Sequence, residues 1–244
     1  MTNRRSFLVL GLSAFLALSG CATEKKTVRA PSTHYVDTTT FVLSRVLAPP
    51  PANDSAETRA ELDEMLKIQA SRTAEQSARA TADAEVSVFR FSDAVGSDRF
   101  KAANLPLTVA LFKKIADDEV WAASAAKDAF ARPRPFLLEP QLQPLLKKPH
   151  SASYPSGHSA WGMAVGLVLA DMLPEKRVQI MARAREYAKN RVVVGVHYPS
   201  DVESGLQSGS ALVAVLFSSP QFRADQAAAT KELRAALDLT PLDR

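Results

Sequence analysis

The sequence predicts an all-α protein, an irregular helical bundle. Most segments after residue 54 place their apolar residues at the three-to-four-residue spacing of a helix. Prolines stand between these segments, where they end one helix or begin the next. The chain has 244 residues, of which 46% are hydrophobic and 23% charged, so it can form one domain with a sizeable core.

The first twenty residues have the composition of a secretory signal peptide. Arg4 and Arg5 precede an apolar run, and small residues lead to Cys21, the only cysteine of the chain. The tetrapeptide Leu-Ser-Gly-Cys that ends there resembles the lipobox of bacterial lipoproteins. We therefore expect residues 1–20 to be a lipoprotein signal peptide and Cys21 to be lipidated. A plain signal peptide with an incidental cysteine is the alternative.

The expected anchor determines the domain organisation and the location. Residues 21–42 are polar and lack periodicity, so we expect a tether there and a single all-helical domain over 43–244. Ala22 follows the cysteine, which favours the outer membrane. The domain is thus expected in the periplasm, with the membrane reached only through the lipid anchor. The two leader arginines also resemble a twin-arginine signal, which leaves the export route open.

Caps and prolines set the expected helix boundaries. Asp54 and Glu57 resemble a capping box at the start of the first helical segment. Pro106 suits the first position of the next helix, and the prolines within 133–135 end it. Residues 86–91 fit either a short strand or a helix. The expected helices span about residues 54–83 with a break near 71–73, 107–130, 159–173, 175–190, 200–217 and 221–237.

The charge balance argues against some functions. The 30 Lys and Arg residues, less the two in the leader, face 26 acidic ones, so the rest of the chain carries a charge too small to indicate nucleic-acid binding. No stretch after the leader is apolar for long enough to span a bilayer. The basic residues of the 175–190 segment are expected on a solvated face: Lys176, Arg177, Arg183, Arg185 and Lys189.

The stretch Tyr154–His158 predicts an anion site at a helix start. It is a turn directly before an apolar helical run. The first N–H groups of a helix have no intrahelical partner and lie at the positive end of its dipole, so Ser156 and Gly157 can donate to an anion. His158 would stand at the rim, where its side chain titrates near neutral pH.

Two further stretches supply cations and a paired histidine. Lys127 lies seven residues before Arg134, about two helical turns, so both can point to the same end of one helix. Arg191 and His197 frame an apolar run, and Asp201 follows His197 by about one helical turn. An aspartate that accepts a hydrogen bond from one ring nitrogen fixes the imidazole tautomer and makes the other nitrogen a better nucleophile or base.

Together these residues describe a site for a phosphoryl group. Three cations would neutralise the oxygens of the transition state, so no metal or other cofactor is expected. One histidine would attack phosphorus and the other would protonate the leaving oxygen. The two other histidines of the chain, His34 and His150, are expected to take no part.

The order of these motifs resembles the phosphatidic-acid-phosphatase type 2 (PAP2) superfamily. Lys-x6-Arg-Pro, Pro-Ser-Gly-His and Arg-x5-His-x3-Asp follow one another between residues 127 and 201. The contexts Val46–Pro51, Ser153–His158 and Gly195–Val202 resemble in particular the bacterial class A non-specific acid phosphatases. The resemblance covers about residues 43–225 and implies the helical bundle of the PAP2 and vanadium-haloperoxidase type.

The resemblance also implies which residues bind the phosphate. The matching positions are Lys127, Arg134, Ser156, Gly157 and Arg191. The family usually has serine directly before the arginine of the third motif, where this chain has Asn190. An asparagine amide can still donate to a phosphate oxygen, so we expect Asn190 to belong to the phosphate-binding set.

The catalytic roles follow from the same resemblance. It makes His197 the nucleophile that forms a phosphohistidine, Asp201 the residue that orients it, and His158 the general acid. His158 must be protonated and His197 neutral, so an acid pH optimum is expected. The expected function is a metal-independent phosphomonoesterase of broad range acting on small phosphomonoesters. A homo-oligomer is left open.

Three alternatives remain at this point. Vanadium haloperoxidases resemble the family in fold and in their phosphate-binding motifs, although they are generally longer. An envelope lipid-phosphate or pyrophosphate phosphatase would use the same site, although most such relatives span the membrane several times. A non-catalytic, anion-binding lipoprotein is the third, and it is supported by the lipobox and by Asn190.

Overall fold

The computed structural model describes residues 33–37 and 39–242, and over that range every regular element is helical. The predicted all-α class is therefore confirmed. The α-helices are α1 (Ala56–Ser71), α2 (Ala74–Ala82), α3 (Ser92–Val95), α4 (Pro106–Phe130), α5 (Pro135–Leu138), α6 (Gly157–Met172), α7 (Arg177–Val193), α8 (Pro199–Leu216) and α9 (Pro220–Ala236). Short 3₁₀ turns lie at Leu43–Arg45, Val88–Phe91, Ala102–Asn104 and Pro174–Lys176.

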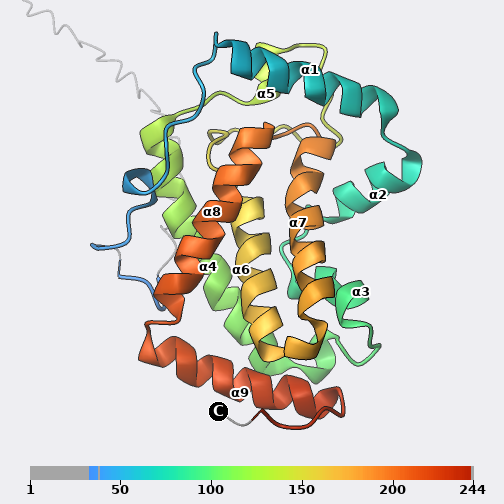
Figure 1. Cartoon of the computed structure of the whole chain (residues 1–244), viewed down its shortest axis with the longest axis vertical. Helices are drawn as coiled ribbons and strands as arrows, with labels where there is room; N and C mark the ends of the chain where they lie inside the picture. Colours follow the sequence, from blue (N-terminus) through green and yellow to red (C-terminus); the bar gives the residue numbers. More distant parts are fainter. Residues whose placement is uncertain (1–32, 38, 243–244) are drawn as a thin grey trace, which may run out of the picture.

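Helix α6 is the buried centre of the bundle. Its residues are apolar or small on almost every side, as expected of a helix surrounded by others. It packs most extensively against α7 and α8, with α4 as a further neighbour (Figure 1). Trp161 and Tyr187 are the largest side chains of the main core, and their rings lie 5.4 Å apart. The centre of the fold is therefore the helix that begins at the Pro-Ser-Gly-His turn.

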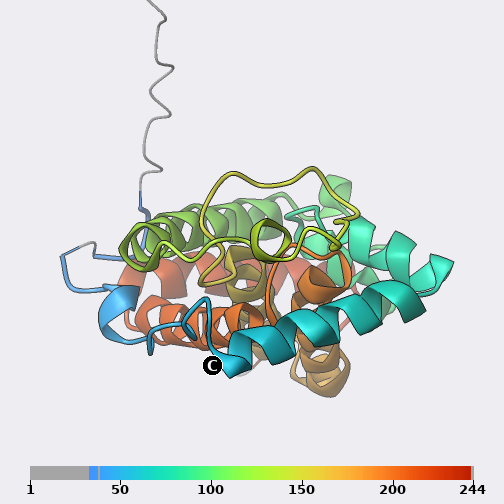
Figure 2. The same ribbon diagram turned by 90° about the horizontal axis from the view of Figure 1, so that it is seen from above.

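Four helix ends meet at one end of the bundle. Helices α4 and α7 finish there, α6 and α8 begin there, and α1 crosses that end, while α9 crosses the opposite one (Figure 1). The Ser156 N–H donates to the Asp201 carbonyl at 3.0 Å, which ties the start of α6 to the first turn of α8. Figure 2 looks down on this end and shows the long connection between α5 and α6 arching beside it.

Several element boundaries differ from those expected. Ser55, not Asp54, caps α1, and its hydroxyl accepts the Thr58 N–H at 3.1 Å. Helix α7 continues to Val193, so Arg191 lies inside a helix and not in a link. The ambiguous segment 86–91 contains a 3₁₀ turn. The break near 71–73 is confirmed, because α1 and α2 are separate helices.

The packed body begins upstream of residue 43. Tyr35, Val36 and Phe41 are buried. The backbone N–H groups of His34 and Tyr35 donate to the carboxylate of Asp118 in α4, at 2.6 and 3.0 Å. The last part of the expected tether is therefore held against the bundle. The signal peptide, Cys21 and the start of the tether lie outside the described residues.

The basic residues of α7 do not share one solvated face. Arg177, Arg185 and Lys189 are exposed, but Arg183 is only 3% exposed. Its guanidinium donates to the buried carboxylate of Asp83 at 2.5 Å. The expectation was wrong for Arg183 because a run of charges along a sequence does not show which member faces a buried acid. Within the described range, no helix combines the length and the hydrophobicity needed to cross a bilayer.

The close approach of α8 to α6 gives a first prediction. A Cβ at Gly209 would lie 2.2 Å from the Ala160 carbonyl oxygen and 2.9 Å from the Met163 Cβ. Gly209→Ala should push the two helices apart and lower the free energy of unfolding by about 1–3 kcal/mol in urea titrations. Ser210→Ala, at the exposed neighbouring position, should stay within about 0.5 kcal/mol of the parent. Equal stability of both variants would contradict this packing.

Candidate active site

The predicted site residues come from separate segments that meet at the end of the bundle crossed by α1. Helix α4 contributes Lys127 near its C-terminus, and the turn before α5 contributes Arg134. The start of α6, the end of α7, the link that follows it and the first turn of α8 contribute the rest: Ser156, Gly157, His158, Arg191, His197 and Asp201. Positions spread over 75 residues of sequence are thus brought together by the convergence of helix ends.

His197 is buried between an arginine and an aspartate. Its Nε2 lies 2.8 Å from the Arg134 Nη1, and its Nδ1 lies 3.3 Å from the Asp201 Oδ2. A guanidinium can only donate, so Nε2 accepts and carries the lone pair, while the ring proton sits on Nδ1 toward Asp201. Burial lowers the pKa of His197 well below its ordinary value, and Arg134 and Lys127 lower it further. The ring is therefore neutral, with the lone pair of Nε2 directed toward Arg134.

Asp201 is held by a network that sequence reasoning missed. Its Oδ1 accepts from the Arg132 guanidinium at 2.7 Å, and its Oδ2 accepts the Tyr198 N–H at 3.0 Å and the Ser153 hydroxyl. Arg132 also donates to Glu61 of α1 at 2.9 Å. Burial raises the pKa of Asp201, and Arg132 and these hydrogen bonds oppose that rise. Helix α1 is thereby linked, through Arg132, to the histidine that Asp201 orients.

The two arginines of the Arg-Pro-Arg-Pro segment have different partners. The segment between α4 and α5 is irregular: Ala131 has a left-handed backbone and Arg134 an extended one. Arg132 stacks on the Tyr198 ring, with 3.8 Å between its Cζ and the ring centroid, and donates to Asp201. Arg134 instead reaches His197.

Lys127 lies among backbone carbonyls. Its Nζ donates to the carbonyl oxygens of Ala152 at 2.8 Å and Pro155 at 2.7 Å. Burial lowers the pKa of Lys127 to about 8, and Arg134 adds to the effect. The carbonyls hold the ammonium group at the turn that precedes α6, next to the expected anion site.

Arg191 has unused donors. Its Nε and Nη1 are buried, and neither has a hydrogen-bond partner within the described part of the chain. Burial lowers the pKa of Arg191 to about 10. Its charge is close enough to lower the pKa of both His158 and His197. Buried polar groups in folded proteins are normally paired, so these nitrogens indicate a place where an anion can be accepted.

The start of α6 has the geometry expected of an anion site. Ser156 is the N-cap, and its hydroxyl accepts the Ser159 N–H at 3.3 Å. Gly157 is the first helical residue, and a Cβ there would lie 3.1 Å from the Glu119 Oε1. The absence of a side chain at Gly157 leaves the backbone of the first turn accessible. Ser156 keeps its own hydroxyl proton as a donor.

His158 is hydrogen-bonded to the backbone of the segment that follows α2. Its Nε2 lies 3.1 Å from the Ala84 carbonyl oxygen, which can only accept, so Nε2 carries a proton and Nδ1 is left to gain or release a second one. Burial and then Arg191 lower the pKa of His158 to about 3, while the bond to Ala84 opposes the shift. The ring is therefore neutral at physiological pH.

Asn190 has a partner that the sequence did not indicate. Its amide nitrogen donates to the Asp83 Oδ2 at 2.7 Å, so one of its two N–H groups is bound to a buried carboxylate. A carboxylate is a stronger acceptor than a neutral group, and the longer asparagine side chain can reach it.

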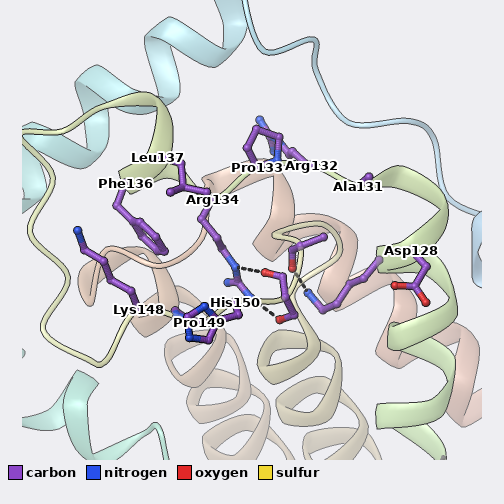
Figure 3. Close-up of a pocket in the computed structure, with 13 residues that line it drawn as sticks. Asp128, Ala131, Arg132, Pro133, Arg134, Phe136, Leu137, Lys148, Pro149 and His150 are labelled. Carbon is purple, nitrogen blue, oxygen red and sulfur yellow. Dashed lines mark hydrogen bonds between the residues drawn. The ribbon is translucent and has the colours of Figure 1, made fainter. Parts of the chain in front are cut away.

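A cavity of about 620 Å³ opens beside Lys127 and Arg134 (Figure 3). The long connection between α5 and α6 forms one wall, and two hydrogen bonds from Arg134 to Ser151 hold that wall in place. Phe136 and His150 also line the cavity. His34 is bonded to Asp117 outside the cavity lining.

Comparison with known proteins identifies the family. The PAP2 superfamily model matches residues 105–225. A non-specific acid phosphatase of Salmonella typhimurium is 32% identical over 198 residues, which cover 77% of this chain and 78% of that protein. The chain belongs to the PAP2 superfamily. A non-specific acid phosphatase of Providencia stuartii is 31% identical over 227 residues, 85% of each chain. The predicted likeness to bacterial acid phosphatases is thus confirmed over most of the chain.

A solved structure shows the same fold. A bacterial vanadium-dependent chloroperoxidase superposes with a TM-score of 0.57 at 15% identity, covering 82% of this chain and 54% of that one. The chain therefore spans about half the length of that enzyme. At this identity the likeness confirms the helical architecture expected from the sequence, and the fold alone.

The buried acid Glu119 gives a prediction about pH. Its Oε1 has no hydrogen-bond partner among the described residues, and burial raises its pKa from 4.5 to about 8, with Lys127 opposing. The folded state then keeps a proton that the unfolded state releases, so stability is lost as pH rises from about 4.5 through 8. Glu119→Gln should remove that loss and gain roughly 3–5 kcal/mol relative to the parent across this window.

Urea titrations at pH 5 and pH 8.5 would test this. Glu64→Gln, at an exposed position of α1, is the matched control and should leave the pH dependence as in the parent. If the difference in the free energy of unfolding between Glu119→Gln and the parent does not grow with pH, Glu119 is ionised in the folded state.

Proposed function

We propose that this protein is a metal-independent phosphomonoesterase that acts through a phosphohistidine at His197. One observation supports this above the others: a buried, neutral histidine offers the lone pair of Nε2 within a cluster of three cations, and an aspartate holds its other nitrogen. Such a nitrogen can act as a nucleophile, because burial keeps water away from its lone pair. The acid phosphatases that are similar over most of the chain support the same reaction class.

The phosphate would be held by the cations and by the start of α6. The unpaired nitrogens of Arg191 would donate to one oxygen, and Lys127 and Arg134 to the others. The first turn of α6, with Ser156 and Gly157, would add N–H and hydroxyl donors. On binding, Arg134 would exchange its hydrogen bond to the His197 Nε2 for one to a phosphate oxygen, which frees the lone pair for attack.

The first chemical step would transfer the phosphoryl group. The Nε2 of His197 forms a bond to phosphorus while the bond from phosphorus to the leaving oxygen breaks. The imidazole becomes cationic, and the carboxylate of Asp201, 3.3 Å from Nδ1, stabilises that charge. The leaving oxygen takes the proton from Nδ1 of protonated His158.

The second step would return the enzyme to its starting state. Water attacks phosphorus, its proton passes to the Nδ1 of His158, and the nitrogen–phosphorus bond breaks with its electron pair returning to His197. Inorganic phosphate leaves. Each proton and electron pair is restored, so the cycle needs no metal and no redox partner. The cavity beside Lys127 and Arg134 would receive the leaving alcohol. Its volume of about 620 Å³ suits a broad range of small phosphomonoesters.

The location is also a proposal. The leader indicates export to the periplasm and a lipid anchor at Cys21 in the outer membrane. Both features lie outside the described residues, and Cys21→Ser, which removes the thiol that would carry the lipid, should abolish lipid attachment as measured by mass spectrometry.

The acid optimum gives a prediction about His158. Burial is the main cause that lowers its pKa to about 3, and Arg191, Arg134 and Lys127 lower it further. A bound phosphate dianion offsets most of the charge of the three cations, so it should raise the pKa of His158 by about 2 units or more. Proton NMR titration with and without inorganic phosphate would measure this. A pKa that stays near 3 with phosphate bound would contradict the role of His158 as the acid.

Hydrolysis of p-nitrophenyl phosphate in EDTA tests the proposed function. The chain from Ala22 onward should turn over at acid pH, and His197→Ala should lose roughly a thousandfold or more in kcat. His34→Ala is the matched control because His34 bonds to Asp117 away from the site, and it should retain activity. Halide oxidation with added vanadate and no hydrolysis would favour a haloperoxidase. Phosphate binding without any turnover would favour an anion-binding lipoprotein.

A further inference from the structure

A buried carboxylate outside the phosphate site has three side-chain donors. Asp83 directly follows α2 and is 0% exposed. Its Oδ1 accepts from Arg183 at 2.5 Å and from Arg90 at 3.1 Å, and its Oδ2 accepts from Asn190 at 2.7 Å. A buried carboxylate is tolerated only when it is paired and hydrogen-bonded, as here. The reaction described above makes no use of this group.

The next two residues after this carboxylate form part of the active-site wall. The Ala84 carbonyl accepts from His158 at 3.1 Å, and the Glu85 carbonyl accepts the Tyr187 hydroxyl at 2.9 Å. The Tyr187 ring lies nearly parallel to the His158 ring, with 6.4 Å between centroids and 15° between planes. The segment 83–85 and Tyr187 therefore hold one nitrogen and one face of the imidazole.

This contact determines which nitrogen of His158 can act. Because Nε2 donates to the Ala84 carbonyl, the transferable proton is on Nδ1. The carbonyl also lies just beyond the C-terminal end of α2, where the helix dipole favours a positive charge. A displacement of this segment would turn the ring and remove the hydrogen bond that opposes the lowering of its pKa.

We infer that Asp83 is a positioning residue for the general acid, because it holds the segment 83–85 against α7 so that Ala84 fixes the ring of His158. Asn190 takes part by donating to Asp83. At this position the family usually has serine, whose shorter side chain could not span the same distance. The inference rests on the proposed function, because it takes His158 to be the acid.

Dependence on the leaving group separates this role from a merely structural one. An alkyl alcohol is a basic leaving group and needs a proton, whereas p-nitrophenolate leaves readily without one. Loss of acid positioning should therefore lower kcat/KM much more for ethyl phosphate than for p-nitrophenyl phosphate. A general loss of folded enzyme would lower both by the same factor.

The experiment compares kcat/KM for the two substrates in Asp83→Asn, Asn190→Ala and Tyr187→Phe. In each variant kcat/KM for ethyl phosphate should fall roughly tenfold or more. The fall in kcat/KM for p-nitrophenyl phosphate should be several times smaller. Asn190→Ala and Tyr187→Phe each remove one hydrogen bond, so they carry the test if Asp83→Asn does not fold. Gln226→Ala, in α9, is the matched control. It removes an amide that donates to Asp171 at 2.8 Å, and it should leave kcat/KM unchanged for both substrates.

His158→Ala separates failure of this inference from failure of the proposed function. A selective loss on ethyl phosphate in His158→Ala, with equal losses on both substrates in the folded Asn190→Ala and Tyr187→Phe variants, would overturn the inference alone. Equal losses on both substrates in His158→Ala would overturn the assignment of the acid, and the inference with it.

Discussion

The rest of the site depends on the burial of three cations beside two histidines. Burial lowers the pKa of Lys127, Arg134 and Arg191, because a charge without water is unfavourable. Backbone carbonyls around Lys127 offset part of this penalty, but two nitrogens of Arg191 have no partner in the described structure. In the proposed function a phosphate dianion would supply the missing negative charge. The proposed affinity for phosphate and the neutrality of both histidines would then have the same electrostatic origin.

The helical bundle makes this concentration of charge possible. Helices α4 and α7 end where α6 and α8 begin, so side chains from four helices reach one point (Figure 1). Small residues at the α6–α8 contact let the two helix starts approach, and the Ser156 N–H then reaches the Asp201 carbonyl. Arg132 extends the same arrangement outward to Glu61 on α1. The catalytic geometry is therefore supported by packing that lies well away from the phosphate.

The sequence predicted what depends on local pattern. Periodicity and prolines indicated the helices, and motif spacing indicated the residues that meet at the site. Arg132, Glu119 and Asp83 were missed because their importance comes from partners that only the tertiary fold brings near: Asp201, Gly157 and Asn190 respectively. Arg183 was assigned to solvent because a charge run does not show which member faces a buried acid. The bond from one N–H of Asn190 to Asp83 was also missed, because only the tertiary fold brings the two side chains together.

The central claim is a covalent bond between phosphorus and His197, and trapping that intermediate tests it most directly. A substrate with a labelled phosphoryl group would be mixed with enzyme, quenched in alkali within milliseconds, and the modified peptide identified by mass spectrometry. A phosphohistidine is stable to alkali and labile to acid, so the account predicts an acid-labile label on the peptide that contains His197, with none in His197→Ala. Label on a different residue, or a pre-steady-state burst without labelled protein, would contradict it.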